Sequence, residues 1–366
     1  MEIVLISDGP LPLDSPVRKL PFFFPARLVD MADVSSRTVG QARVAVIELL
    51  DASEAGLTAL KKAWSSIAQI PVLCLISTKD RREVMQAAAL GKPEVVQRDT
   101  PLSVLVRKVR GKLGDDLADK MPDSVPAEMA EAYRKGSAFL EGLALSATDG
   151  SKIQINLLNE SANEILTTLS RYGMAPWMDA IHSHHSPTYR HSLMVAGVAG
   201  LFARFQGADE AGCREMVAGG LIHDIGKMRI PLTILDKPGR LTDEEREIVD
   251  RHVEFGREIL KPRLELPFDI KKMAIQHHEC LDGSGYPDGL KGDKISPKVR
   301  QMTICDIFCA LTEARIYKDS LPTRVAIDMM RKMDGKLDQD MLHRFSEMVL
   351  DRSFGDVSRV KASEDA

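Results

Sequence analysis

The chain has 366 residues, with 49 basic and 53 acidic side chains and a net charge of −4. At about 100 to 200 residues per domain, this length allows two or three domains. A composition of 44% hydrophobic and 28% charged residues excludes a disordered or fibrous chain. Charges of one sign do not form long runs, which argues against binding of a nucleic acid polymer or an anionic membrane, so an anionic partner should be small.

The cysteines and the N-terminal residues indicate the cellular compartment of the protein. The five cysteines include no C-x-x-C pair, which argues against a disulfide framework and against a thiolate zinc site. The apolar run at the N-terminus is far too short for a signal peptide or a membrane span. We therefore expect a cytoplasmic protein with reduced thiols and no membrane association.

The first third of the chain alternates short β-branched runs with helical stretches. Near-continuous apolar strands separated by helices are typical of a parallel sheet covered on both faces. This pattern predicts an α/β doubly wound domain over residues 1–120. Its predicted strands are 3–6, 42–50, 71–77 and 94–96, and its predicted helices are 54–68, 80–90 and 101–113.

From about residue 120 the apolar period becomes 3.6, which predicts helices over 127–145 and 156–172. The stretch 121–126 contains two prolines and few apolar residues, as a linker would. We therefore expect a linker with connecting helices over 121–180 and an all-α helical bundle over 181–360.

The histidines are concentrated in the second part of the chain. Only His343 of the nine lies beyond residue 279, and the others are His182, His184, His185, His191, His223, His252, His277 and His278. Helical periodicity places several polar residues on faces that apolar residues define. These are His191, the pair His223-Asp224 at the end of an apolar helix, His252, His277 or His278, and Asp306.

A single histidine on an apolar face is more often a hydrogen-bonded core residue than a ligand. Several imidazoles and two carboxylates in one core are different, because each unpaired buried charge costs several kcal/mol. Divalent cations compensate many lone pairs compactly, and a nitrogen and oxygen donor set suits iron, manganese or zinc. Seven ligands are too many for one ion and suit two, with Asp224 placed to bridge them.

Two cations about 3.5 to 4 Å apart can activate water and stabilise a phosphoryl transition state, so phosphoester hydrolysis is the predicted reaction class. Lys227, Arg315 and Lys318 supply positive charges near the same helix ends and could bind phosphate oxygens. Solvated surface charge is the alternative for these three residues.

The stretch 277–287, HHECLDGSGYP, resembles the signature of the HD-GYP family, a subset of the HD-domain metal phosphohydrolases. The similarity covers roughly residues 185 to 325 and includes the motifs at 223–227 and 315–318. It implies hydrolysis of the bacterial second messenger cyclic di-GMP, to linear pGpG or on to GMP, at a di-iron or di-manganese centre.

The resemblance also implies roles for individual residues. Lys227 would contact the scissile phosphate or protonate the leaving oxygen, while Arg315 and Lys318 would hold phosphates. Gly285 and Tyr286 would help shape the guanine and partner surface, although Asp-Gly-Ser-Gly is also ordinary turn chemistry. The implied metal ligands are His191, His223, Asp224, His252, His277, His278 and Asp306, all present in this chain.

Two departures from the family pattern favour two metals over three. Pro187 stands where some members have a glutamate ligand, and Cys309 stands where a second aspartate often occurs. His182, His184 and His185 are interpreted as surface residues or an adventitious metal patch.

The first domain resembles a response-regulator receiver whose phosphorylation residues are altered. Ser7-Asp8, Glu48, Ser77 and Arg98 occupy the expected functional positions. A glutamate cannot form the aspartyl phosphate, and losing an acidic residue weakens magnesium binding. Asp51 is a nearby alternative phosphoacceptor. We expect a phosphorylation-independent module for docking or for homodimerisation.

Two other functions stay open. The chain could be a non-hydrolysing receptor or scaffold that binds cyclic di-GMP or a diguanylate cyclase, although such a protein has no need of the complete ligand set. It could also act on another nucleotide, although the extended loop around Tyr286 argues against this. The choices between iron and manganese, and between pGpG and GMP as product, are not decided.

Overall fold

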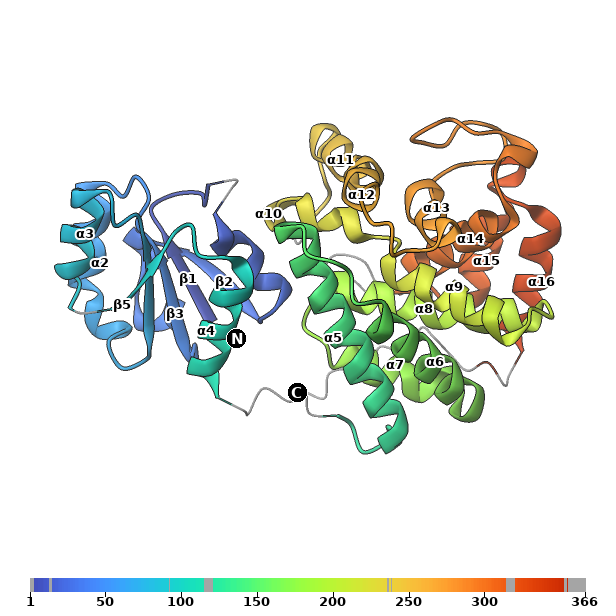
Figure 1. The fold of residues 1–366 in the computed structure, drawn as a ribbon, viewed down its shortest axis with the longest axis horizontal. Helices are drawn as coiled ribbons and strands as arrows, with labels where there is room; N and C mark the ends of the chain where they lie inside the picture. The colour runs from blue at the N-terminus through green and yellow to red at the C-terminus, as the bar shows by residue number, and fades with distance from the viewer. Residues whose placement is uncertain are drawn as a thin grey trace. The chain divides into compact units, whose positions relative to one another are not determined.

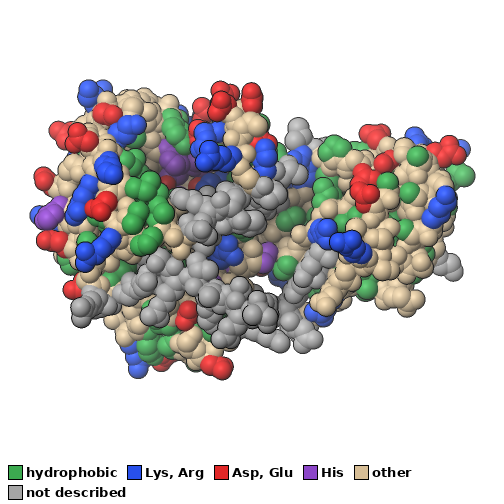
Figure 2. Space-filling model, turned by 180° about the vertical axis from the view of Figure 1, so that it is seen from behind, with side chains coloured by type: hydrophobic (Ala, Val, Ile, Leu, Met, Phe, Trp, Pro, Cys, Tyr) green, Lys and Arg blue, Asp and Glu red, His purple; other side chains and the backbone are tan. Residues whose placement is uncertain are grey.

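The computed structural model describes residues 3–12, 15–91, 93–114, 121–235, 237, 239–313, 320–351 and 354. The chain divides into two compact units, Met1–Asp119 and Lys120–Ala366 (Figure 1). On the face shown in Figure 2, basic and acidic side chains are interspersed. None of the helices in the described part of the chain is long and apolar enough to cross a membrane.

The first unit contains a five-stranded parallel sheet with the order β2-β1-β3-β4-β5. The strands are β1 Ile3–Ser7, β2 Ala26–Asp30, β3 Val44–Glu48, β4 Val72–Ile76 and β5 Glu94–Gln97. Every residue of β1 and β3 is buried, which explains why the first four residues of each strand are apolar. The predicted α/β doubly wound class is confirmed.

Helices cover both faces of this sheet. Helices α2 Glu54–Lys62 and α3 Arg81–Ala88 lie on one side and α4 Leu102–Leu113 on the other (Figure 1). The short helix α1 Ser36–Val39 contributes Val39 to the core beneath α2.

Strand β2 was missed in the sequence analysis, which predicted no strand between residues 6 and 42. It has the sequence ARLVD and lies at the edge of the sheet, and only Val29 is fully buried. An edge strand with one buried side chain lacks the apolar run that marks a central strand.

The second unit contains helices and no strand among its described residues, which confirms the predicted all-α class. The two predicted helices correspond to the first two of the series. The helices are α5 Ala127–Asp149, α6 Ile155–Tyr172, α7 Met174–His182, α8 Pro187–Phe205, α9 Glu210–Ile222, α10 Leu232–Leu235, α11 Asp243–Asp250, α12 His252–Leu260, α13 Phe268–Gln276, α14 Pro297–Thr312, α15 Thr323–Arg331 and α16 Gln339–Leu350.

Helix α8 lies at the centre of this unit and packs against α6, α9 and α14. Most of its side chains are buried. Gly220 of α9 permits close contact, because a Cβ there would lie 2.5 Å from Ala196 Cα of α8. This tight packing brings the polar residues of α8, α9 and α14 close to one another.

Candidate metal centre

Three of the predicted ligands follow the end of a helix. His223 follows α9, His252 follows α11 with Arg251 between them, and His277 follows α13. The last carbonyl groups of a helix lack intrahelical partners and can accept a side-chain hydrogen bond. In each of these histidines, Nδ1–H donates a hydrogen bond to the backbone carbonyl three residues earlier, so that Nε2 carries the free lone pair. The distances are 2.8 Å from His223 to Gly220 O, 2.8 Å from His252 to Val249 O and 3.2 Å from His277 to Ala274 O.

The first cluster combines His191 of α8, His223 and Asp306 of α14, all buried. Their ligand atoms lie within 4.8 Å of one another. Asp306 Oδ1 is 2.9 Å from His191 Nε2 and 3.7 Å from His223 Nε2.

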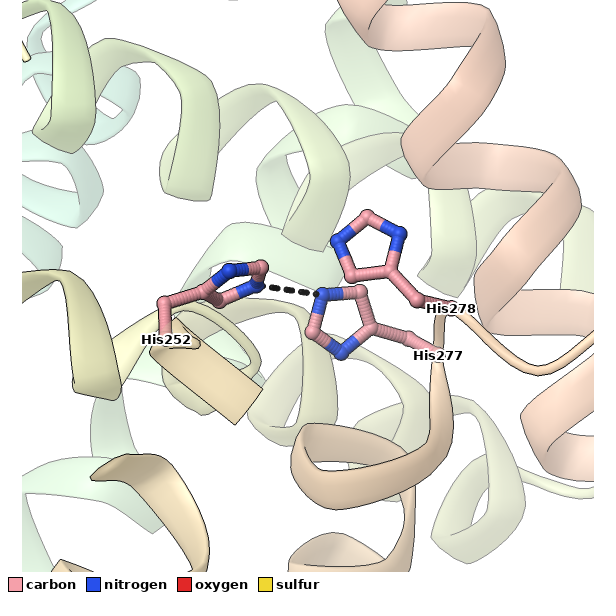
Figure 3. Close-up of side chains that lie close together, drawn as sticks. All are labelled: His252, His277 and His278. Atoms are coloured by element: carbon pink, nitrogen blue, oxygen red, sulfur yellow. Dashed lines mark hydrogen bonds between the residues drawn. The ribbon is translucent and has the colours of Figure 1, made fainter. Parts of the chain in front are cut away.

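The second cluster combines His252, His277 and His278, again with ligand atoms within 4.8 Å of one another (Figure 3). The Nε2 atoms of His252 and His277 are 3.3 Å apart. Neighbouring residues at the end of α13 supply two of the rings, and the start of α12 supplies the third (Figure 3).

Asp224 lies between the two clusters. Its Oδ1 is 3.4 Å from His252 Nε2, and its Oδ2 is 3.2 Å from His223 Nε2 and 3.8 Å from His191 Nε2. Lys227, one turn later in η5 Ile225–Arg229, places Nζ 2.5 Å from the same Oδ2. One carboxylate therefore faces both sets of histidines.

Burial controls the protonation of the second cluster. Burial lowers the pKa values of all three histidines, His252, His277 and His278, to about 3. Their rings are neutral near pH 7, as metal ligation requires. In His191 burial also lowers the pKa, but Asp306 and Glu313 outweigh it and raise the pKa to about 9.

The two aspartates stay ionised. Burial alone would raise the pKa of Asp224, but its interactions with the side chains of His223 and Lys227 hold it well below its usual range. Burial opposes ionisation of Asp306 in the same way, and the hydrogen bond with His191 holds its pKa well below its usual range.

This arrangement leaves polar atoms uncompensated. Among the described residues, His223 Nε2 and Asp224 Oδ1 are buried without a hydrogen-bond partner. Such groups are costly unless a cation or a donor compensates them. Imidazole nitrogens and carboxylate oxygens without a thiolate suit a divalent metal ion, so the residues present fit a divalent metal centre.

The loop after His278 is held against the second cluster. Buried Glu279 accepts hydrogen bonds from the backbone amides of Asp288, at 2.7 Å, and Leu290, at 2.8 Å. The Tyr286 ring stacks on His278 with centroids 4.9 Å apart. A Cβ on Gly285 would lie 2.3 Å from Cys280 N, so the loop requires glycine there. The structure therefore brings Gly285 and Tyr286 to the edge of the site.

Glu279 and Glu313 are buried at the site, and no role was predicted for either of them from the sequence. Glu279 belongs to the signature stretch 277–287, but no sequence pattern indicates that its side chain binds backbone amides of the loop. Glu313 follows Asp306 by seven residues, which is two helical turns. That spacing was the signal that could have identified it.

The structure gives different results for the predicted phosphate-binding residues and for the three histidines upstream of His191. Arg315 and Lys318 lie outside the described residues. His182, His184 and His185 do not belong to any metal-ligand cluster found in the described part of the chain. His182 is exposed and His185 is partly exposed. The interpretation as a surface residue was wrong for His184, which is buried and whose Nδ1 accepts a hydrogen bond from Ser186 N at 3.0 Å.

In the first unit, Glu48 already has partners. It is 1% exposed, with Oε1 2.9 Å from Arg98 Nε and Oε2 accepting a hydrogen bond from Ser15 Oγ at 2.7 Å. Arg98 also binds Glu83, at 2.7 Å. Asp51 is exposed and lies in the turn after β3, with a φ of 55°.

Comparison with known proteins finds similarity over the part of the chain that carries this site. A family model described as an HD domain matches residues 175–341, which include all seven predicted ligands. A cyclic di-GMP phosphodiesterase of Pseudomonas aeruginosa is 36% identical over 162 residues, which are 44% of this chain and 39% of that protein. A 3'3'-cGAMP-specific phosphodiesterase of Vibrio cholerae is 36% identical over 207 residues, covering 56% of this chain and 44% of that protein.

A cyclic di-GMP phosphodiesterase of Thermotoga maritima is 27% identical over 330 residues, covering 88% of this chain and 82% of that protein. The chain spans about half or less of the length of the Pseudomonas and Vibrio relatives. Residues 175–341 therefore match an HD domain, and this part of the chain carries the stretch that resembles the HD-GYP signature.

Proposed function

We propose that this chain is a phosphodiesterase that hydrolyses cyclic di-GMP, to pGpG or GMP, with two divalent metal ions, iron or manganese. The observation that carries the proposal is the position of Asp224 between two clusters of three ligands each. A carboxylate shared by two sets of imidazoles can hold two metal ions close together, as the chemistry of a two-metal hydrolase needs. The relatives named as cyclic dinucleotide phosphodiesterases support the substrate class.

The bound metal ions would supply Lewis acidity and an activated water. The side chains of the chain would do the rest. Lys227 is partly exposed beside Asp224, so its ammonium group can reach a phosphate oxygen or protonate the leaving oxygen. Arg315 and Lys318 would hold the remaining phosphate charge. Tyr286, against His278, would help shape the surface for the guanine base.

The first unit would serve as a docking or dimerisation module that does not depend on phosphorylation. Its Glu48 is engaged by Arg98 and Ser15, which supports a constant structure at the position of the expected phosphoacceptor. A diguanylate cyclase or a second copy of the chain would be the partner.

The test is metal analysis of anaerobically purified chain, followed by chromatography of its products from cyclic di-GMP and, in parallel, from 3'3'-cGAMP. We expect two metal ions per chain and linear products from cyclic di-GMP. Asp224→Asn, which keeps the shape of the side chain, is the matched control and should release no product. A chain that holds two metals and binds cyclic di-GMP without cleaving it would be a receptor, and the proposal would be wrong.

A further inference from the structure

Four of the five cluster histidines are held in two different ways. His223, His252 and His277 each follow a helix end and donate Nδ1–H to a carbonyl of the preceding turn. His191 lies inside α8, four residues after the first residue of that helix. There the preceding carbonyls already accept backbone hydrogen bonds within the helix. The His191 ring therefore needs an acceptor from another part of the fold.

Glu313 is the acceptor within reach. Its Oε2 lies 3.3 Å from His191 Nδ1, and its side chain is 4% exposed. His191 Nδ1 is buried and makes no hydrogen bond of normal geometry to any described residue. On the other side of the ring, His191 Nε2 is 2.9 Å from Asp306 Oδ1. The two ring nitrogens thus face two carboxylates, one inside the cluster and one outside it.

We propose that Glu313 is a positioning residue that holds His191 with Nδ1 protonated, so that Nε2 is presented to the first metal ion. This inference rests on the metal centre of the proposed function. Glu313 acts through His191, because it belongs to none of the ligand clusters found in the described part of the chain. A carboxylate that accepts a hydrogen bond from a metal-bound histidine orients the ring and increases its basicity.

Arg190 is the neighbour that makes a purely structural role conceivable. Its Nε lies 3.9 Å from Glu313 Oε1, which is the outer limit of an ion pair. If Glu313 served only this contact, its loss would lower the stability of the metal-free chain and leave metal affinity unchanged. The two roles therefore predict different measurements.

The test compares Mn²⁺ binding by the full chain and by Glu313→Ala and Glu313→Gln, using equilibrium dialysis without nucleotide. We expect Mn²⁺ affinity to fall roughly 10- to 100-fold in Glu313→Ala, which is the usual effect of losing such a partner. Glu313→Gln should lose less Mn²⁺ affinity, because the amide keeps an acceptor oxygen but not the negative charge. It also preserves the shape of the side chain, so it tests the proposal even if the alanine variant does not fold.

Thr312→Val is the matched control. Thr312 is the adjacent residue, is equally buried, and donates a hydrogen bond to Phe308 O of its own helix. Its removal should leave Mn²⁺ affinity as in the wild type. Unchanged Mn²⁺ affinity in both Glu313 variants, with only a lower melting temperature of the metal-free chain, would overturn the proposal.

A kinetic measurement separates this role from an effect on the residues that follow Glu313. We expect the variants to need more Mn²⁺ for half-maximal hydrolysis, while KM for cyclic di-GMP at saturating Mn²⁺ stays as in the wild type. A raised KM with normal Mn²⁺ affinity would instead assign Glu313 to placement of Arg315 and Lys318. Dialysis uses no nucleotide, so its result stands even if the wild-type chain does not cleave cyclic di-GMP.

Discussion

Asp224 and His252 meet at 3.4 Å, from Oδ1 to Nε2, where η5 crosses the start of α12. The crossing depends on Gly226, because a Cβ there would lie 1.8 Å from His252 O. A glycine two residues after Asp224 thus lets the two clusters share one carboxylate.

The first prediction concerns this crossing. Gly226→Ala should force η5 and α12 apart, lower the metal content and destabilise the fold by about 1–3 kcal/mol or more, as overpacking does. Gly256→Ala is the control, because its Cβ would meet no atom closer than 3.7 Å. Metal analysis and thermal unfolding of both variants check this. A Gly226→Ala chain with wild-type metal content and melting temperature would show that the crossing tolerates a side chain.

The second prediction concerns the shared carboxylate. Asp224→Ala should abolish hydrolysis and lower metal content, because the carboxylate that lies between the two clusters is lost. Asp328→Ala, which removes an exposed carboxylate paired with Arg331 on α15, should change neither. Product chromatography and metal analysis give the comparison. Full turnover with two retained metal ions in Asp224→Ala would refute the two-metal interpretation.

The third prediction concerns Lys227. An ammonium group cannot ligate a cation, so Lys227→Ala should retain its metal ions. It should lower the maximal rate, because the proton donor or phosphate contact is lost, with little change in KM. Metal content and steady-state kinetics are measured in parallel. Wild-type kinetics would mean that Lys227 is a structural partner of Asp224 alone.

The fourth prediction concerns Arg315 and Lys318. Each alanine variant should keep its metal ions and bind substrate more weakly, by about 1.5–3 kcal/mol per charged hydrogen bond. The loss should appear mainly in KM. Kinetic constants indistinguishable from the wild type in both variants would assign these residues to solvated surface charge.

The fifth prediction concerns the first unit. Because Glu48 cannot form an aspartyl phosphate and is held by Arg98, a small phosphodonor should change neither activity nor oligomeric state. Mass spectrometry of the treated chain checks this. A mass increase of one phosphoryl group, located at Asp51, would show that the unit still works as a phosphorylation switch.

Much of the site could be predicted because it depends on local periodicity. His191 and Asp306 recur with apolar residues at helical steps, and His223 and His277 end apolar helices. Such patterns show which side of a helix is buried, whatever that side contacts. The strands β1 and β3 were predictable from a local pattern too, since burial on both faces leaves a run of four apolar residues in each. Strand β2, exposed at the sheet edge, left no such pattern.

The sequence by itself therefore determined the α/β and all-α classes, the buried histidines and aspartates, and their suitability as ligands of a divalent metal ion. The tertiary structure decided how these residues group: which histidines share a cluster, that Asp224 faces both clusters, and that Glu313 reaches His191 Nδ1. The physical reason is that grouping depends on the distance between helices. Contacts at Gly220 and Gly226 set that distance, between segments far apart in the chain. Local periodicity identifies a buried side chain, and only the packing of helices selects its partner.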